Sequence, residues 1–284
     1  MTINDMKKRF ITLVTPILIL SMFGCPGSIL AETVQMKVTT HLKILPTGKL
    51  AVGYDINNLA KETAYHSAVT SFLGNDAQKS DVLGDNPYGG ILYYNCEFDT
   101  ANMKPGNYTL VTRITFNELS GVPHRVYAFN DLAYRPEQVK DAKWALQSRI
   151  IPPRFNLKSL WHTDNKFRIA LTNTAMGNIQ AVAAFYLPDG FSMDEPERFL
   201  ELPLNGQKEE KIPVKLVDPV TAGKHPYHVV LWYDFNGVHY SQVLQGAITA
   251  EEKPVLFKWL LVILAAVALL AGLGYWIHRK RKVA

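Results

Sequence analysis

Apolar and polar positions divide the chain into three kinds of segment. Residues 10–23 and 259–277 are predominantly apolar, whereas the long part between them consists of short β-prone runs. These runs alternate apolar with polar residues, or are rich in β-branched and aromatic residues, and Gly, Pro, Asn and Asp separate them. Such runs with such punctuation are typical of antiparallel strands in a β-sandwich. The pattern therefore predicts an all-β body with an apolar segment at each end.

The N-terminal apolar segment has the pattern of a cleaved export signal. A basic run at residues 7–9 precedes the apolar stretch 10–23, and small residues follow as far as Ala31. The positive charge holds the start of the chain at the cytoplasmic face while the apolar run enters the translocon. We therefore expect residues 1–31 to be a signal peptide that is cleaved after Ala31.

Residues 256–277 are predicted to form a transmembrane helix. The nineteen residues 259–277 carry no charge. At about 1.5 Å per residue, a helix of this length nearly covers a hydrocarbon core of ~30 Å. Trp259 at one end, and Tyr275 and Trp276 at the other, are typical of the aromatic belts at membrane interfaces.

A basic tail, residues 278–284, follows this span, and it holds Arg279, Lys280, Arg281 and Lys282. The positive-inside rule places such a tail in the cytoplasm. The export signal places the body on the opposite side. The two ends together predict a single-pass protein of a bacterial cytoplasmic membrane, with an extracytoplasmic (periplasmic) body and a cytoplasmic C-terminus.

The charge of the body argues against a nucleic-acid partner. The whole chain carries a net charge of +5, but residues 1–31 hold three cations and one acid, and residues 254–284 hold five cations and no acid. Removing these ends leaves 22 cations and 24 acids, a net charge of −2. A nearly neutral body lacks the basic surface that phosphate backbones require.

The body divides into two predicted domains of ordinary size. We expect one Ig-like β-sandwich at residues 32–135 and a second at 154–250, joined by a linker at 136–153. A short helix is predicted over Pro136–Arg149, because proline suits a first helical position and the following residues are good helix formers. The predicted fold class is all-β, two tandem Ig-like antiparallel sandwiches plus one C-terminal transmembrane helix.

The two halves of the body read as copies of one another. The run 55–58 parallels 170–173 at an offset of 115, and the run 106–116 parallels 225–235 at an offset of 119. Because the order of the matches and their offsets agree, we interpret the body as a duplicated domain.

The second half also resembles a known kind of domain. The segments that carry the resemblance are 167–174 (FRIALTNT), 187–191 (LPDGF), 204–214 (LNGQKEEKIPV) and 221–227 (TAGKHPY). Over about residues 155–248 they are similar to bacterial Ig-like domains of the CARDB and NPCBM-associated type. The resemblance implies a seven-stranded sandwich that serves as a spacer or a binding module, without catalytic residues in common. The whole layout is also similar to that of surface proteins of the WxL-interacting type.

The most informative stretch of the body is its last hairpin. Asn236 and Gly237 lie between two β-prone runs, and this pair favours a type I′ turn with positive φ at both residues. Counting outward from the turn pairs Asp234 with His239 and Trp232 with Ser241.

One face of this hairpin is apolar, and the other carries a possible binding site. The second face presents Trp232, His228, Asp234 and His239. An aromatic ring flanked by His and Asp suits the binding of a sugar or a partner protein. Alternatively, the neighbouring domain, the linker helix or a loop covers Trp232. In the first half the equivalent position is Arg113.

The sequence predicts no metal site and no catalytic residues. His225, His228 and His239 do not converge with a further ligand, and an Asp234–His239 surface pair explains them better than zinc does. We find no pattern of a nucleophile elbow, zinc protease or phosphate-binding loop, and we expect no cofactor. Cys96 is the one cysteine outside the signal, so we expect a packed or partly exposed free thiol.

Two functions are compatible with these features. The favoured hypothesis is a non-catalytic, membrane-anchored extracytoplasmic scaffold that holds a protein partner or complex at the membrane. The alternative is a module that binds a glycan or the cell wall through Trp232. An enzyme with an unrecognised site is the third and least supported hypothesis.

Overall fold

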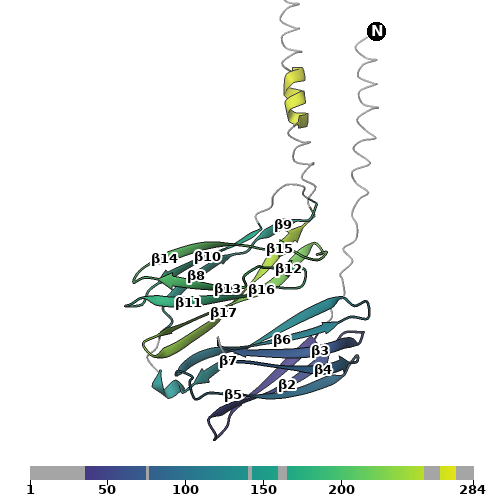
Figure 1. Ribbon diagram of the computed structural model, residues 1–284. Coiled ribbons are helices and arrows are strands. Elements are labelled where there is room, and N and C mark those ends of the chain that lie inside the picture. The colour runs from purple at the N-terminus through teal and green to yellow at the C-terminus, as the bar shows by residue number, and fades with distance from the viewer. Residues whose placement is uncertain (1–35, 75–76, 140–142, 159–164, 253–262, 273–284) are drawn as a thin grey trace, which may run out of the picture. The chain divides into compact units, whose positions relative to one another are not determined.

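The computed structural model describes residues 36–74, 77–139, 143–158, 165–252 and 263–272. Within these ranges the chain is mostly β and forms sandwich-like sheets (Figure 1). The signal peptide, most of the predicted transmembrane segment and the basic tail lie outside the described residues. The first sandwich comprises β1–β7 and the second comprises β8–β17.

The first sandwich consists of a three-stranded and a four-stranded antiparallel sheet. Its order is β1-β2-β5 in one sheet and β4-β3-β6-β7 in the other. The strands are β1 (Met36–Ile44), β2 (Lys49–Asn58), β3 (Ala64–Leu73), β4 (Ala77–Asn86), β5 (Ile91–Asp99), β6 (Gly106–Asn117) and β7 (Pro123–Tyr134). Strand β2 alternates buried and half-exposed positions along its length, as expected for a strand with one face on a core. Leu50, Tyr54 and Phe98 lie in that core.

The second sandwich repeats this arrangement. One sheet has the order β8-β10-β14, and the other strands pair in the order β13-β11-β16-β17. A single parallel bridge between β17 and β6 joins this second set of strands to the four-stranded sheet of the first sandwich, as one nine-stranded sheet that also includes β9. The strands are β8 (Leu146–Ile151), β9 (Arg154–Asn156), β10 (Lys166–Asn173), β11 (Ile179–Tyr186), β12 (Phe191–Ser192), β13 (Glu197–Leu202), β14 (Gln207–Pro213), β15 (Lys215–Leu216), β16 (Gly223–Phe235) and β17 (Val238–Glu251). Strand β9 adds to β17, and β12 pairs with β15. The shared strand order supports the interpretation of the body as a duplication.

A pair of buried asparagines marks the same turn in both copies. Asn58 ends β2 and Asn173 ends β10, and they are 0% and 1% exposed. In each, the side-chain oxygen accepts a hydrogen bond from the amide two residues later, and the side-chain nitrogen donates to the carbonyl four residues later. These bonds fix the chain as it leaves the strand, and they occur at the predicted offset of 115.

The helix predicted over Pro136–Arg149 is wrong. A single 3₁₀ turn, η1, covers Pro136–Gln138, and residues Leu146–Ile151 form strand β8. Strand β8 pairs with β10, so the second sandwich begins within the segment that we interpreted as a linker. The alternation of buried and exposed positions in Leu146–Ile151 fits a strand, and sheet pairing outweighs the helix propensity of these residues.

Other expectations for the body are confirmed. The Asn236–Gly237 turn has φ of 50° and 77°, and the strand pairs on either side are those counted from the sequence. Cys96 is a free, half-buried thiol on β5.

A helix covers residues 263–272. Among the residues with a described position, no helix is both long and apolar enough to cross a bilayer.

Candidate functional site

A third apolar core lies between the two sandwiches, and we call this contact the junction. Val111 on β6 is buried there with Val182, Ala184, Val230 and Trp232 of the second sandwich. Partly buried side chains surround this cluster, namely Phe72, Tyr127, Phe129, Tyr186 and Val243. An apolar contact of this kind resembles a domain core more than a solvent-filled interdomain gap. The sandwiches are therefore packed against each other as one body.

The junction is built from equivalent positions of the two copies. At the offset of 119, Val111 corresponds to Val230 and Arg113 corresponds to Trp232. The neighbouring strands follow the same relation, since Tyr127 lies opposite Arg113 and Ser241 lies opposite Trp232. The two ends of the junction are thus related by the repeat but differ in their side chains.

At one end, polar groups tie β16 and β17 to the first sandwich. The carboxylate of Asp234 accepts hydrogen bonds from His239 Nδ1 at 2.8 Å and from Lys104 Nζ at 2.6 Å. The hydrogen bond from His239, and secondarily the one from Lys104, lower the pKa of Asp234 below its ordinary value. The His239 ring stacks on Tyr108 with a centroid distance of 3.9 Å. The contact of Asp234 with His239 is partly buried and its contact with Lys104 is exposed. We call the contacts among Asp234, His239, Lys104 and Tyr108 the latch.

Backbone contacts reinforce this latch. The His239 amide donates to the Pro105 carbonyl, and His239 forms a parallel bridge with Gly106 of β6. A Cβ on Gly106 would overlap the backbone of His239. Glycine is required at this point because the two strands approach so closely.

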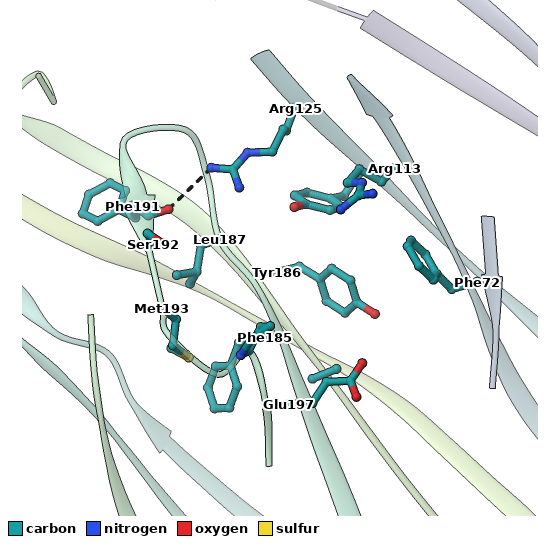
Figure 2. Close-up of a pocket in the computed structure, with 13 residues that line it drawn as sticks. Phe72, Arg113, Arg125, Phe185, Tyr186, Leu187, Phe191, Ser192, Met193 and Glu197 are labelled. Atoms are coloured by element: carbon teal, nitrogen blue, oxygen red, sulfur yellow. Dashed lines mark hydrogen bonds between the residues drawn. The ribbon is translucent and has the colours of Figure 1, made fainter. Parts of the chain in front are cut away.

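At the other end, Asp189 ties the second sandwich to β7. It lies in the Leu-Pro-Asp-Gly-Phe turn and accepts hydrogen bonds from the Arg125 amide at 3.1 Å and from Arg125 Nε at 3.3 Å. His124 Nδ1 contacts the same carboxylate at 3.0 Å. Arg125 also reaches the Phe191 carbonyl, as Figure 2 shows. Both ends of the junction are therefore closed by a carboxylate that contacts basic side chains, Lys104 and His239 at one end and Arg125 and His124 at the other.

A cavity of about 290 Å³ lies beside this second contact. Phe72, Arg113, Arg125 and Tyr127 line it from the first sandwich. The second sandwich contributes residues of β11 and of the segment that follows, Ala184, Phe185, Tyr186, Leu187, Phe191, Ser192, Met193, Pro196 and Glu197. In Figure 2, Tyr186 lies between Arg113 and Glu197. A smaller space of about 50 Å³ lies beside Trp232, and Phe72, Tyr186 and Glu197 line both spaces.

The structure brings the four predicted binding residues together at the junction. Of the two interpretations of Trp232, a binding face in solvent or a covered side chain, the structure has the second, because the first sandwich covers the indole and leaves it 9% exposed. His239 and Asp234 belong to the latch, and His228 stacks on Phe129 at 4.3 Å. These contacts leave the Trp232 face unable to stack on a sugar.

The predicted membrane-anchor residues are not placed by the structure. Trp259, Tyr275, Trp276, Arg279, Lys280, Arg281 and Lys282 all lie outside the described residues.

The histidines discussed as metal ligands have other contacts. His225 Nε2 lies 2.9 Å from the Thr221 carbonyl, while His228 and His239 have the contacts given above. In the part of the chain that is described, no group of three or more His, Cys, Asp or Glu side chains is arranged to hold a metal ion.

Sequence reasoning missed Arg125, Tyr127, Tyr186 and Asp189 as junction residues. One signal was present. In the sequence, residues 229–233 (VVLWY) form a continuous apolar run. In the structure these residues of β16 and residues 108–112 of β6 are buried without alternation, which requires cover on both faces of the sheet. An antiparallel sandwich with one solvated face would have alternated.

The junction is expected to weaken in acid because of His228. Burial lowers the pKa of His228 below its ordinary value of about 6.5. The unfolded chain then binds this proton more readily than the folded one, so the contribution of His228 to stability is full above about pH 6.5 and is lost as the pH falls through the folded pKa. We expect the melting temperature to fall between pH 7.5 and pH 5.5, and to fall less in the His228→Gln variant. An equal fall in both proteins, measured by circular dichroism, would contradict the assignment.

Comparisons with known proteins identify no family. No family model matches the chain, and no curated protein matches it. Red sea bream transglutaminase is 11% identical with a TM-score of 0.27, over 78% of this chain and 31% of that one. Native alpha-2-macroglobulin of E. coli is 9% identical with a TM-score of 0.31, over 77% and 17%. A Porphyromonas gingivalis protein of unknown function is 14% identical with a TM-score of 0.30, over 76% and 99%. The chain spans under a third of the transglutaminase and macroglobulin chains.

Proposed function

We propose that this chain is a non-catalytic interaction module, tethered to a bacterial cytoplasmic membrane with its body on the extracytoplasmic side. Its two sandwiches would be Ig-like domains, with the CARDB and NPCBM-associated type as proposed relatives. The observation that carries the proposal is the apolar junction core around Val111, Val230 and Trp232. Two sandwiches packed through such a core form a stiff body, and stiffness suits a module that holds a partner at a set place near the bilayer.

The polar groups of the junction support a structural role. Asp234 is bound by His239 and Lys104, and Asp189 is bound by Arg125 and His124. Each carboxylate links strands of different sandwiches. These contacts explain the carboxylates as structural groups that hold the two sandwiches together. The tether rests on the uncharged run 259–277 and on the four cations that follow it. The partner that we propose is an extracytoplasmic protein, and the bilayer is the second contact.

The tether can be tested by fractionation and by a C-terminal reporter. We expect sodium carbonate to leave the full-length chain in the membrane pellet, while a variant truncated after Glu252 appears in the soluble fraction. A fluorescent protein that folds only in the cytoplasm should be bright when fused after Ala284. Release of the full-length chain by carbonate, or an alkaline phosphatase fusion at Ala284 that is active, would contradict the topology.

The interaction role needs a separate experiment. A photo-crosslinking residue at Tyr93, which is 68% exposed on β5, or at Phe199 on β13, reports on proteins that contact the body in intact membranes. We expect an adduct of constant size from at least one of these exposed positions. The buried Val52 provides the matched control and should give none. No adduct from any exposed position, with the chain in place in the membrane, would overturn the role.

A further inference from the structure

The repeat makes the 290 Å³ cavity comparable with its counterpart in the other copy. Arg113, which lines the larger cavity, stands where the second copy has Trp232. The adjoining space beside Trp232 is about 50 Å³, and it shares Phe72, Tyr186 and Glu197 with the larger cavity. Tyr127 likewise stands where the second copy has Ser241. One end of the junction is therefore filled by an indole, and the other is open and lined by a guanidinium.

The guanidinium of Arg125 pairs with a carboxylate, whereas the guanidinium of Arg113 contacts an aromatic ring. Arg125 is bound by Asp189 at 3.3 Å. Arg113 lies over the Phe72 ring at 5.5 Å, and its Nε is buried without a hydrogen-bond partner among the residues described. A buried donor that lacks an acceptor is costly, and a charged one is more so. Glu197 also lines the cavity but is exposed to solvent.

The remaining walls supply apolar surface and neutral hydroxyl groups. Leu187, Phe191 and Met193 are apolar and buried. Burial, and secondarily the Glu197 carboxylate, raise the pKa of Tyr186, so its hydroxyl stays protonated at neutral pH. Burial raises the pKa of Tyr127 as well. An apolar pocket with a few convergent polar groups is the usual form of a small-ligand site.

We propose that this cavity binds an organic carboxylate with a short apolar or aromatic body. The carboxylate would accept hydrogen bonds from Arg113, whose guanidinium matches its geometry, and from the hydroxyl of Tyr186. The apolar body would pack against Phe72, Leu187 and Met193. The proposal goes beyond the scaffold function, because the cavity can hold such a ligand whether or not the chain is tethered or has a protein partner.

The test compares an acid with its neutral isostere on the purified full-length chain. The probes are 3-phenylpropionate and 3-phenylpropanamide, and the measurement is isothermal titration calorimetry at pH 7.5. We expect the acid to bind at least tenfold more tightly than the amide. Equal affinity of the two probes, or no heat from the acid at millimolar concentration, would overturn the proposal.

Variants assign any binding to the cavity. Arg113→Met should weaken binding of the acid at least tenfold, and Arg113→Lys, which keeps the charge, should weaken it less. Arg113→Trp copies the residue of the equivalent position, so it should fill the cavity and abolish binding while the circular dichroism spectrum is kept. Arg149→Met, at an exposed arginine of β8, is the matched control and should bind like the unaltered chain. Unchanged affinity in folded Arg113→Met and Arg113→Trp variants would contradict the site.

Discussion

Replacing Trp232 by alanine should lower the free energy of unfolding by about 3–5 kcal/mol. Trp232 is the largest buried side chain in the junction core, where it packs with Val111 and Val230. Truncation leaves a cavity between two sheets whose backbones are fixed by their own sandwiches, so the site cannot easily collapse. The measurement is urea unfolding of the purified full-length chain, followed by circular dichroism.

The same experiment separates the junction from the surface in general. Tyr93→Ala removes an aromatic ring of similar size from an exposed position, and it should change the unfolding free energy by no more than about 0.5 kcal/mol. If Trp232→Ala and Tyr93→Ala had equally small effects, the indole would not be packed as described and the stiff-body proposal would lose its support.

Asn173→Ala is expected to cost about 2–4 kcal/mol, because it leaves several backbone groups without partners. The Asn173 side chain donates to the carbonyls of Gly177 and Leu202 at 2.8 and 3.1 Å and accepts from the Ala175 amide at 2.8 Å. With 1% exposure, water does not reach the side chain to replace these bonds. The unfolding midpoint in urea should move accordingly.

The equivalent asparagine in the first copy provides an internal comparison. Asn58→Ala should have an effect of similar size, since Asn58 binds Glu62, Asn86 and Ala60 in the same way. Asn95→Ala, at an exposed position of β5, serves as the control and should be nearly neutral. A large difference between Asn58→Ala and Asn173→Ala would show that the two turns are not equivalent.

Local chemistry explains which parts of the fold could be predicted from sequence. The Asn236–Gly237 turn fixed the hairpin register residue by residue, because few other pairs accept positive φ at both positions. The segment 136–149 could not be assigned correctly, because its composition favours a helix while its partner strand β10 lies some twenty residues further along the chain. Pairing with a distant strand leaves little trace in local composition.

The candidate site depended even more on distant contacts. Trp232 was correctly placed on the face opposite the core of its own sandwich, but sequence alone did not show that β6 would cover that face. Arg113 appeared only as the counterpart of Trp232 in the repeat. Its significance depends on the cavity between the sandwiches, and the shape of a cavity follows from packing, which single residues do not reveal.

The use of equivalent faces at the junction has a consequence for how such a molecule can diversify. A twofold homodimer presents each contact twice, so any substitution at its interface is imposed on both halves. Here the two halves share one polypeptide, and their high effective concentration maintains the pairing. Each half can then change alone. One end carries Trp232 and the other carries Arg113, an asymmetry that no pair of identical subunits can reach.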